Sequence, residues 1–322
     1  MALKREFFVA LAAGFCTAGP AVASCGSAFC LVNTNWSVQG IWNEPGLRAD
    51  LRYEYIDQDQ PRTGTRDIAV GEIPHHHDEI RTLNRNIFAT LDYGFNDYWG
   101  ASLVIPWVDR KHDHIHNHGG GKLLESWNFS DLGDIRLTGR YQFLAGESPE
   151  KISLSFAGFT AGLKLPTGKT DVANGDGDVA ERTLQPGTGT TDALIGAYYR
   201  QVLGQWNASW FIQANAQLPL NSHANFRPGR QILADLGVRW EATDKLGVLL
   251  QLNAHHKARD SGSDAEPDDS GSRTLSISPG VTYTVTRGIQ LYAFVQLPVY
   301  QRVNGVQLVA DRSFAAGASM QF

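Results

Sequence analysis

Apolar and polar residues alternate along most of this 322-residue chain, in segments of about ten residues that begin near residue 47. The segment 134–143 shows the pattern most clearly. Its apolar face carries Ile135, Leu137, Gly139, Tyr141 and Phe143, and its polar face carries Asp134, Arg136, Thr138, Arg140 and Gln142. Because successive side chains of a β-strand point to opposite faces, this period of two predicts strands with one apolar and one polar face.

Such strands fit either a soluble sandwich or a transmembrane barrel. In a sandwich the apolar face meets a core, whereas in a barrel it meets lipid and the polar face lines the lumen. No segment approaches the roughly 20 apolar residues that a transmembrane helix needs, and the mean hydropathy is −0.25. Since lipid offers no partner for backbone N–H and C=O groups, a membrane location leaves only a closed barrel.

The pattern recurs often enough to predict about twelve strands. We expect them near residues 48–55, 83–94, 100–110, 134–143, 151–165, 190–202, 206–218, 231–241, 246–258, 273–285, 289–301 and 308–322. Short turns at 96–97, 145–150, 203–205, 243–245 and 287–288 alternate with polar loops at about 58–82, 111–129, 166–189, 219–229, 259–272 and 302–307. Short turns on one rim and long loops on the other are typical of outer-membrane barrels. The sequence therefore predicts an all-β fold, a transmembrane antiparallel up-and-down β-barrel over residues 47–322.

The N-terminus has the layout of a secretory signal peptide. Lys4 and Arg5 precede a short apolar stretch, and Ala21-Val22-Ala23 fits a cleavage site, which predicts a signal peptide over residues 1–23. Residues 24–46 are then an N-terminal periplasmic or plug segment. Cys25 and Cys30 within it are expected to form a disulfide in an oxidising compartment. The alternative is that Val22-Ala23-Ser24-Cys25 acts as a lipobox, so that Cys25 is lipidated.

The C-terminus predicts export to the outer membrane of a Gram-negative bacterium. The last apolar face runs through Phe314, Ala316, Ala318 and Met320 and ends at Phe322. A terminal aromatic residue in phase with this face is typical of the signal read by the barrel assembly machinery. Outer-membrane lipid and this machinery are therefore the expected partners.

Three short motifs resemble a known family. They are Leu132-Gly133-Asp134-Ile135-Arg136, Leu163-Lys164-Leu165-Pro166-Thr167-Gly168 and Gly187-Thr188-Gly189. They are similar to the outer-membrane transporter family labelled as the phenol-degradation MetA-type pathway protein. The resemblance implies a porin-like barrel and leaves the substrate undefined.

The polar faces of the predicted strands carry charges of both signs. The predicted lumen-lining residues are Arg48, Asp50, Arg52, Glu54, Asp92, Asp134, Arg136, Arg140, Asp235, Arg239 and Glu241. They form either a selective polar path or salt bridges that close the lumen. The chain has 33 acidic and 28 basic residues, for a net charge of −5, which gives no indication of a nucleic-acid surface.

Histidines are concentrated in the predicted outer loops and suggest a metal site. His75, His76, His77 and Asp78 lie in the first loop, and His112, His114, His116 and His118 lie in the second. Imidazole is a common ligand for Zn, Cu and Ni, and Glu79 or Asp113 would complete a ligand shell. The alternative is a solvated polar loop, because no spacing here fixes a tetrahedral site.

Acidic residues in the later loops suggest a negative outer mouth. Asn174-Gly175-Asp176-Gly177-Asp178 resembles the start of a calcium loop, but Val179 occupies the position that requires glycine. A second group comprises Asp260, Asp264, Glu266, Asp268 and Asp269. These acids would favour cations near the mouth.

Two functions follow as hypotheses. The first is a channel for a small polar or cationic solute, with metal-binding loops at its mouth. The second is a non-conducting barrel that displays a metal-binding or partner-docking surface. No nucleophile, haem, phosphate-loop or dinucleotide motif supports an enzyme.

Overall fold

The computed structural model describes residues 32–39, 45–73, 78–118 and 121–322. The elements in chain order are α1 (Trp36–Gln39), β1 (Gly46–Gln58), β2 (Gln60–Gly64), β3 (Arg66–Asp67), β4 (Asp78–Gly94), β5 (Trp99–His118), β6 (Gly121–Leu132), β7 (Arg136–Ser148), β8 (Ser153–Lys164), β9 (Asp192–Leu203), β10 (Ala208–Pro219), β11 (Gln231–Glu241), β12 (Leu246–Lys257), β13 (Ser272–Thr286), β14 (Ile289–Val309) and β15 (Ser313–Gln321). Short 3-10 turns at Pro149–Lys151 and Gly204–Trp206 join neighbouring strands. No helix in the described ranges is long and apolar enough to cross a membrane.

Twelve of these strands close into one antiparallel barrel. The sheet runs in the order β13-β12-β11-β10-β9-β8-β7-β5-β4-β1-β15-β14, and β14 pairs back onto β13. The first and last barrel strands lie side by side, with Arg48 opposite Gln321 and Ile56 opposite Ser313. Closure leaves no strand edge open to lipid. The predicted twelve-stranded up-and-down barrel is confirmed.

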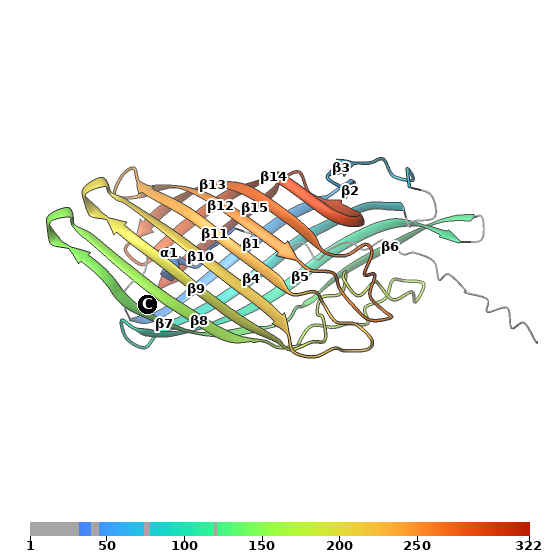
Figure 1. Cartoon of the computed structure of the whole chain (residues 1–322), viewed down its shortest axis with the longest axis horizontal. Coiled ribbons are helices and arrows are strands. Elements are labelled where there is room, and N and C mark those ends of the chain that lie inside the picture. The colour runs from blue at the N-terminus through green and yellow to red at the C-terminus, as the bar shows by residue number, and fades with distance from the viewer. Residues whose placement is uncertain (1–31, 40–44, 74–77, 119–120) are drawn as a thin grey trace, which may run out of the picture.

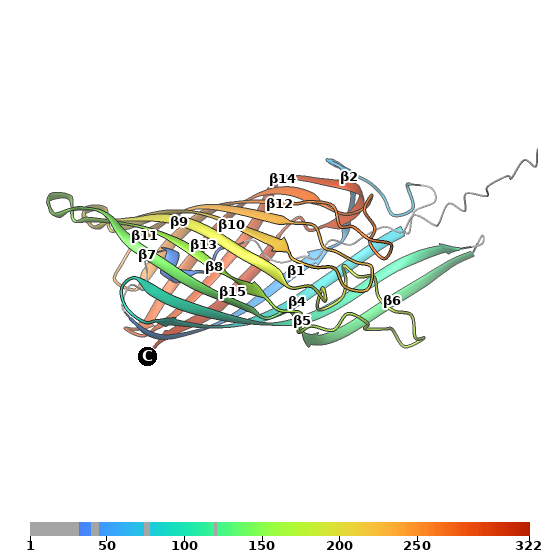
Figure 2. The same ribbon diagram turned by 60° about the horizontal axis from the view of Figure 1, so that its bottom comes forward.

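The two ends of the barrel differ (Figures 1 and 2). Short turns and the C-terminus lie at one end, whereas the long connections lie at the other. Apolar side chains point outward along the wall, among them Leu51, Leu137, Ile195 and Leu236. Exposed aromatic rings gather next to the short turns, with Tyr93, Phe95, Tyr98, Trp99, Trp206 and Trp240 as the main members. This arrangement is that of a lipid-facing band bordered by an aromatic girdle.

The predicted loop at residues 111–129 is wrong. The chain instead continues as the second half of β5 and returns as β6, with His118 opposite Gly121 and Trp107 opposite Leu132. This β5–β6 hairpin projects beyond the rest of the wall (Figure 2). Outside the membrane both faces of a strand meet water or polar groups, so the alternation that reveals the other strands is lost here.

Two other loop predictions also need correction. In the predicted 58–82 loop, β2 and β3 form a small extension and β4 already begins at Asp78. The predicted 302–307 loop belongs to β14, which pairs with β2 after a register shift between Val303 and Val306. The last strand begins at Ser313, five residues later than predicted. The end of β14 packs against β2 and not against lipid, with Val306, Leu308 and Val309 buried, so it lacks the alternation that marks a lipid-facing strand.

Candidate functional site

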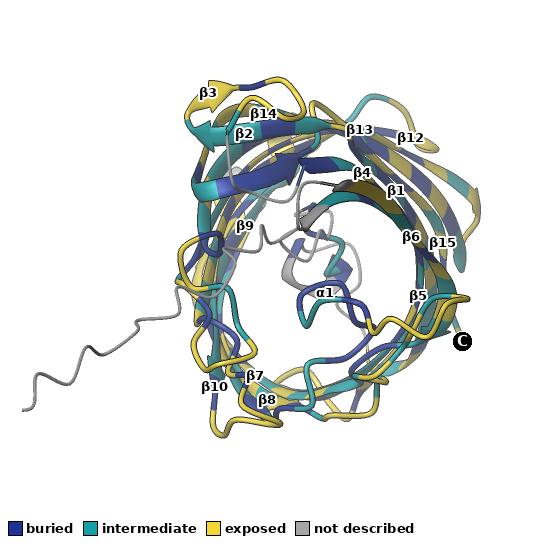
Figure 3. Cartoon of the chain, turned by 90° about the vertical axis from the view of Figure 1, so that its right-hand side faces the viewer, coloured by how far each residue is buried: buried dark blue, intermediate teal, exposed yellow. Residues whose placement is uncertain are grey.

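Residues 32–39 lie inside the barrel. Figure 3 shows α1 within the lumen when the barrel is viewed along its axis. The backbone N–H of Asn33 donates to Gln251 Oε1 at 2.9 Å, and its side-chain amide donates to Gln213 Oε1 at 2.5 Å and to Asp235 Oδ2 at 3.1 Å. These bonds tie the segment to three neighbouring strands, β10, β11 and β12.

Trp36 anchors the same segment to β14 and β1. Its ring lies edge-on to Tyr292 with the centroids 4.8 Å apart, and it stacks near Phe294 at 6.4 Å. Its indole N–H donates to Asp50 Oδ2 at 3.2 Å. Trp36 is buried, with 4% of its surface exposed. Specific contacts with several strands therefore hold the segment inside the lumen.

Three cavities in the described part of the chain share lining residues near the middle of the lumen. Their volumes are about 310, 210 and 60 Å³, and all three are lined by Phe88, Arg136 and Gln217. The largest is walled partly by residues 32–36 and also contains Leu194, Leu233 and Asn215. Apolar and polar groups therefore line neighbouring spaces.

Arg136 is placed differently from the other basic groups at this junction. Within the described ranges, its side chain makes no hydrogen bond or ion pair. The nearby acids already have cationic partners: Lys164 Nζ lies 2.7 Å from Asp134 Oδ2 and 3.4 Å from Asp192 Oδ2. Likewise, Arg52 pairs with Glu54 at 3.1 Å. The guanidinium of Arg136 is therefore the positive charge left available to a solute at the junction.

The family-like motifs come together beside this junction. Asp134 Oδ1 accepts the backbone N–H of Gly168 at 3.1 Å, and Asp134 Oδ2 accepts that of Thr188 at 3.0 Å. Thr167 Oγ1 donates to the carbonyl of Gly133 at 2.8 Å. A Cβ atom at Gly187 would collide with the backbone of Gly168, so glycine is required for this approach. The motifs thus fasten both ends of the connection between β8 and β9.

The structure places the predicted lumen-lining residues along the whole barrel. Arg48, Asp50, Arg52, Asp92, Arg136 and Asp235 line the cavity of about 310 Å³, and Asp134 lines that of about 60 Å³. Glu54 is fully buried beside Arg52, and Arg140 packs over Gly100. Arg239 and Glu241 pair at 2.5 Å near the short turns. These residues are thus divided between cavity walls and ion pairs, which the sequence pattern could not distinguish.

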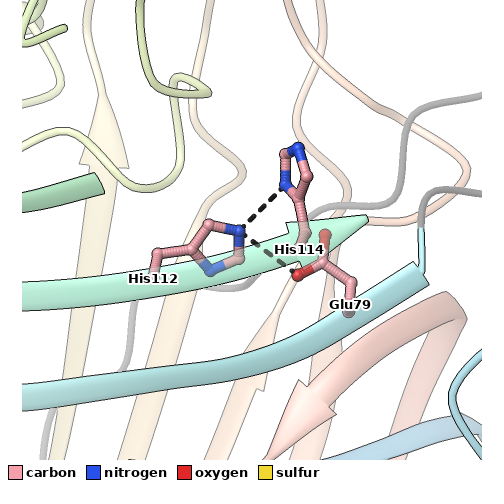
Figure 4. A group of neighbouring side chains, drawn as sticks. All are labelled: Glu79, His112 and His114. Atoms are coloured by element: carbon pink, nitrogen blue, oxygen red, sulfur yellow. Dashed lines mark hydrogen bonds and ion pairs between the residues drawn. The ribbon is translucent and has the colours of Figure 1, made fainter. Parts of the chain in front are cut away.

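A second cluster lies on the lumen side of the β5–β6 hairpin and its neighbour β4 (Figure 4). Glu79, His112 and His114 point toward one another there. His112 Nε2 lies 3.1 Å from His114 Nδ1 and 3.5 Å from Glu79 Oε2. A register shift between Glu79 and Arg81 lets Glu79 share the inner face with Thr82. A bulge of this kind re-aims a side chain toward a site.

Further side chains support this cluster. Thr82 Oγ1 lies 2.8 Å from His112 Nδ1, and Glu125 Oε2 lies 3.1 Å from His114 Nε2. His116 Nδ1 lies 3.3 Å from Glu125 Oε1. The ring of Trp127 covers the cluster, with its centroid 4.9 Å from that of His114. Sequence reasoning missed Glu125, although Gly119-Gly120-Gly121 is a turn signal that would place it opposite His114.

Two of the other predicted metal ligands, Asp78 and Asp113, have partners outside the cluster. Asp78 Oδ2 lies 3.6 Å from Lys122 Nζ, and Asp113 accepts a hydrogen bond from Ser126 on the outer face of the hairpin. His118 belongs to the backbone of β5, but its side chain is outside the described part of the chain. His75, His76 and His77, and also Cys25, Cys30 and the predicted signal peptide, lie outside the described residues.

This part of β5 stands beyond the lipid band, since its outward side chains are charged: Arg85 pairs with Asp109 at 2.7 Å and Arg81 with Asp57 at 2.5 Å. Burial lowers the pKa of His112 well below its ordinary value, with smaller effects from His114 and Arg110. Burial also lowers the pKa of His114, although Glu125 opposes this. Both imidazoles are therefore neutral near pH 7, which is the form that binds metals.

Acidic side chains from two long connections surround the same region. Burial raises the pKa of Glu266 to about 9, and the negative charges of Glu79, Asp269 and Asp260 add to this effect. Burial likewise raises the pKa of Glu181 well above its ordinary value, with contributions from Glu266 and Glu79. The inner side of the long-loop end is thus rich in acidic groups, which favours a bound cation.

The comparisons with known proteins now identify the family. The sequence profile described as "Putative MetA-pathway of phenol degradation" matches residues 82–306. The chain belongs to this family. The family-like motifs between Leu132 and Gly189 lie within the matched region. They supply the hydrogen bonds to Asp134.

Solved structures similar to this MetA-pathway family member are outer-membrane barrels. A COG4313 outer membrane channel from Pseudomonas putida F1 matches with a TM-score of 0.64 and 13% identity, over 87% of this chain and 97% of that chain. The translocator domain of the autotransporter NalP from Neisseria meningitidis has a TM-score of 0.45 and 10% identity over 87% and 90% of the two chains. The toluene transporter TbuX from Ralstonia pickettii has a TM-score of 0.42 and 8% identity over 88% and 91%. No curated protein matches the sequence.

These results fix the class of protein. The family match and the first structural similarity identify an outer-membrane β-barrel. The other two similarities are too weak to support an argument about function. The signal peptide, the disulfide and the assembly role of Phe322 stay predictions.

Proposed function

We propose that this protein is an outer-membrane channel for small organic solutes that carry a negative charge next to an apolar group. The observation that carries this proposal is the guanidinium of Arg136, which makes no side-chain bond to another described residue at the point where three cavities meet. A planar guanidinium binds carboxylate or sulfonate groups through two parallel hydrogen bonds.

The apolar side of the junction supports a solute with a ring or short chain. Phe88 borders all three cavities, and Trp36 and Leu194 line the largest. Arg52 lies over the ring of Phe88 with its guanidinium carbon 4.6 Å from the centroid. An apolar group in contact with Phe88 would place its anionic group within reach of the basic side chains. The family description, which concerns phenol degradation, also supports a ring-bearing solute.

The preference for anions differs from the cation preference that the loop acids suggested. Asp176, Asp178, Asp264 and Asp268 are exposed at the mouth. At physiological salt, exposed charges are screened over about 8 Å, whereas charges in a narrow lumen are screened much less. We therefore expect the enclosed junction to set selectivity, because Arg136 lies there and makes no side-chain hydrogen bond or ion pair with another described residue.

Reversal potentials test this proposal. We would insert the purified full chain into planar bilayers and measure the reversal potential in a KCl gradient, then replace chloride by benzenesulfonate and, separately, potassium by trimethylphenylammonium. We expect anion selectivity and measurable benzenesulfonate current. Arg136→Gln should shift the reversal potential toward cation selectivity.

Arg85→Gln is the matched control, because Arg85 pairs with Asp109 on the outer surface. Its reversal potential should equal that of the wild type. Cation selectivity in the wild type would contradict the proposal, as would a reversal potential that Arg136→Gln leaves unchanged.

A second candidate is a closed barrel with a binding role. It is favoured by the hydrogen bonds and ring contacts that hold residues 32–39 in the lumen. A barrel without conductance to either ion would support this candidate and exclude the channel.

A further inference from the structure

The cluster at the β4–β5 boundary has the geometry of a metal site. We propose that Glu79, His112 and His114 bind a divalent transition-metal ion, with Zn²⁺ as the best match. Glu79 comes from β4 and the two histidines come from β5. One ligand atom from each side chain lies within 4.8 Å of the other two.

The spacing of the ligand atoms fits a tetrahedral ion. Zn–N and Zn–O bonds of about 2.0 to 2.1 Å place neighbouring ligand atoms about 3.3 Å apart. His112 Nε2 lies 3.1 Å from His114 Nδ1 and 3.5 Å from Glu79 Oε2. An ion would therefore fit between these atoms with only small side-chain movements, and water would occupy the fourth position.

The second nitrogen of each imidazole is held by an outer partner. Thr82 contacts His112 Nδ1, and the carboxylate of Glu125 contacts His114 Nε2. A carboxylate or hydroxyl on the far nitrogen fixes the tautomer and orientation of a metal-bound histidine. Because both imidazoles have such a partner, Nε2 of His112 and Nδ1 of His114 remain directed at the same point. His116 supports Glu125 in turn.

Burial and charge favour the same conclusion. Glu79, His112 and His114 are each at most 2% exposed. Two carboxylates, Glu79 and Glu125, lie next to the imidazoles of His112 and His114. A divalent cation would stabilise this arrangement. The donor set of two histidines and one carboxylate suits Zn²⁺, Ni²⁺ or Cu²⁺ better than Mg²⁺, which prefers oxygen ligands.

Metal titration of the full chain tests this site independently of transport. We would strip the detergent-purified protein with EDTA, then measure Zn²⁺, Ni²⁺, Cu²⁺ and Mg²⁺ binding by calorimetry and bound zinc by mass spectrometry after dialysis. We expect a single Zn²⁺ ion per chain and no Mg²⁺ binding. With Co²⁺, the visible absorption should have the intensity of a four-coordinate site.

Variants locate the ion. His112→Asn, His114→Asn and Glu79→Gln should each weaken zinc binding by more than about 100-fold, whereas Glu125→Gln and Thr82→Val should weaken it by about 10- to 100-fold. Resistance of the unheated barrel to SDS checks that each variant is folded. The smaller loss of zinc binding in Glu125→Gln and Thr82→Val is a result that misfolding of the barrel would not produce.

Two controls address the other histidines. His223→Asn changes an exposed loop histidine, and a triple variant changes His75, His76 and His77 to Ala. Both should bind zinc as the wild type does. Unchanged binding in folded His112→Asn and His114→Asn would overturn the proposal, and so would loss of binding in the triple variant alone.

Discussion

At the scale of single residues, the ion pair between Asp134 and Lys164 holds the connection between β8 and β9 in place. Lys164 is 3% exposed and Asp134 is 7% exposed, and both also bond to the backbone or side chains around Thr188 and Thr190. Removal of one partner of a buried pair leaves the other charge uncompensated, which typically costs about 3 to 5 kcal/mol.

We therefore expect Asp134→Asn to lower the free energy of unfolding by about 3 kcal/mol or more, measured by urea titration in lipid vesicles. Asp131→Asn is the matched control, because Asp131 pairs with Lys169, which is 63% exposed. An exposed pair contributes about 0 to 1 kcal/mol. Equal effects of the two substitutions would show that the buried pair does not hold the loop.

Glu266 makes the stability of the loop end depend on pH. Its pKa in the folded protein is about 9, above its ordinary value of 4.5. The folded state therefore retains a proton that the unfolded chain loses, so this contribution to stability is present at low pH and is lost as the pH rises through about 9. The charged groups that face it are Glu79, Asp269, Asp260 and Glu181.

We expect the urea midpoint of the metal-free protein to fall between about pH 5 and about pH 9. The fall should be smaller in Glu266→Gln, because the neutral amide has no proton to lose. Glu150→Gln, at an exposed position near a short turn, should behave as the wild type. A pH profile of Glu266→Gln that matches the wild type would count against this role.

At the scale of elements, the segment 32–39 sets the width of the lumen. Trp36 supplies its main apolar contact, with Tyr292 and Phe294. A buried tryptophan changed to alanine typically costs about 3 to 5 kcal/mol, which would favour release of the segment by about 100-fold or more.

We therefore expect Trp36→Ala to raise the single-channel conductance, measured in planar bilayers. Trp240→Ala is the control, because Trp240 is 55% exposed on the outer face of β11. An unchanged conductance in Trp36→Ala would show that the segment does not restrict ion flow.

The elements also show where sequence reasoning succeeded and where it failed. The strand at 231–241 was predicted with its observed bounds, because Leu236 and Val238 must face lipid while Asp235 and Arg239 face the lumen. The β5–β6 hairpin was missed, because outside the lipid its outward positions, such as Lys111 and Asp113, are polar. The alternation of apolar and polar residues is required only where a strand faces lipid, so it does not reveal the parts of strands outside the membrane.

At the scale of the whole molecule, sequence could predict the barrel but not the pairing of its charges. The sequence pattern placed Arg136 and Asp134 on one polar face, but it could not reveal that Asp134 is bound to Lys164 while Arg136 faces a cavity. Likewise it grouped seven histidines in two loops, whereas the structure, among the residues it describes, brings His112 and His114 together with Glu79 at a bulge. Both distinctions depend on contacts between strands that are distant in sequence.

The hydrogen bonds that Asp134 accepts from Gly168 and Thr188 affect how the connection between β8 and β9 can vary in this fold. These bonds hold Gly168 and Thr188 at the strand ends, while residues 175–178 between them form an exposed tip. Changes of length or composition at that tip would leave these hydrogen bonds and the barrel wall unchanged. One scaffold could thereby present different outer surfaces to the environment and keep the same inner passage.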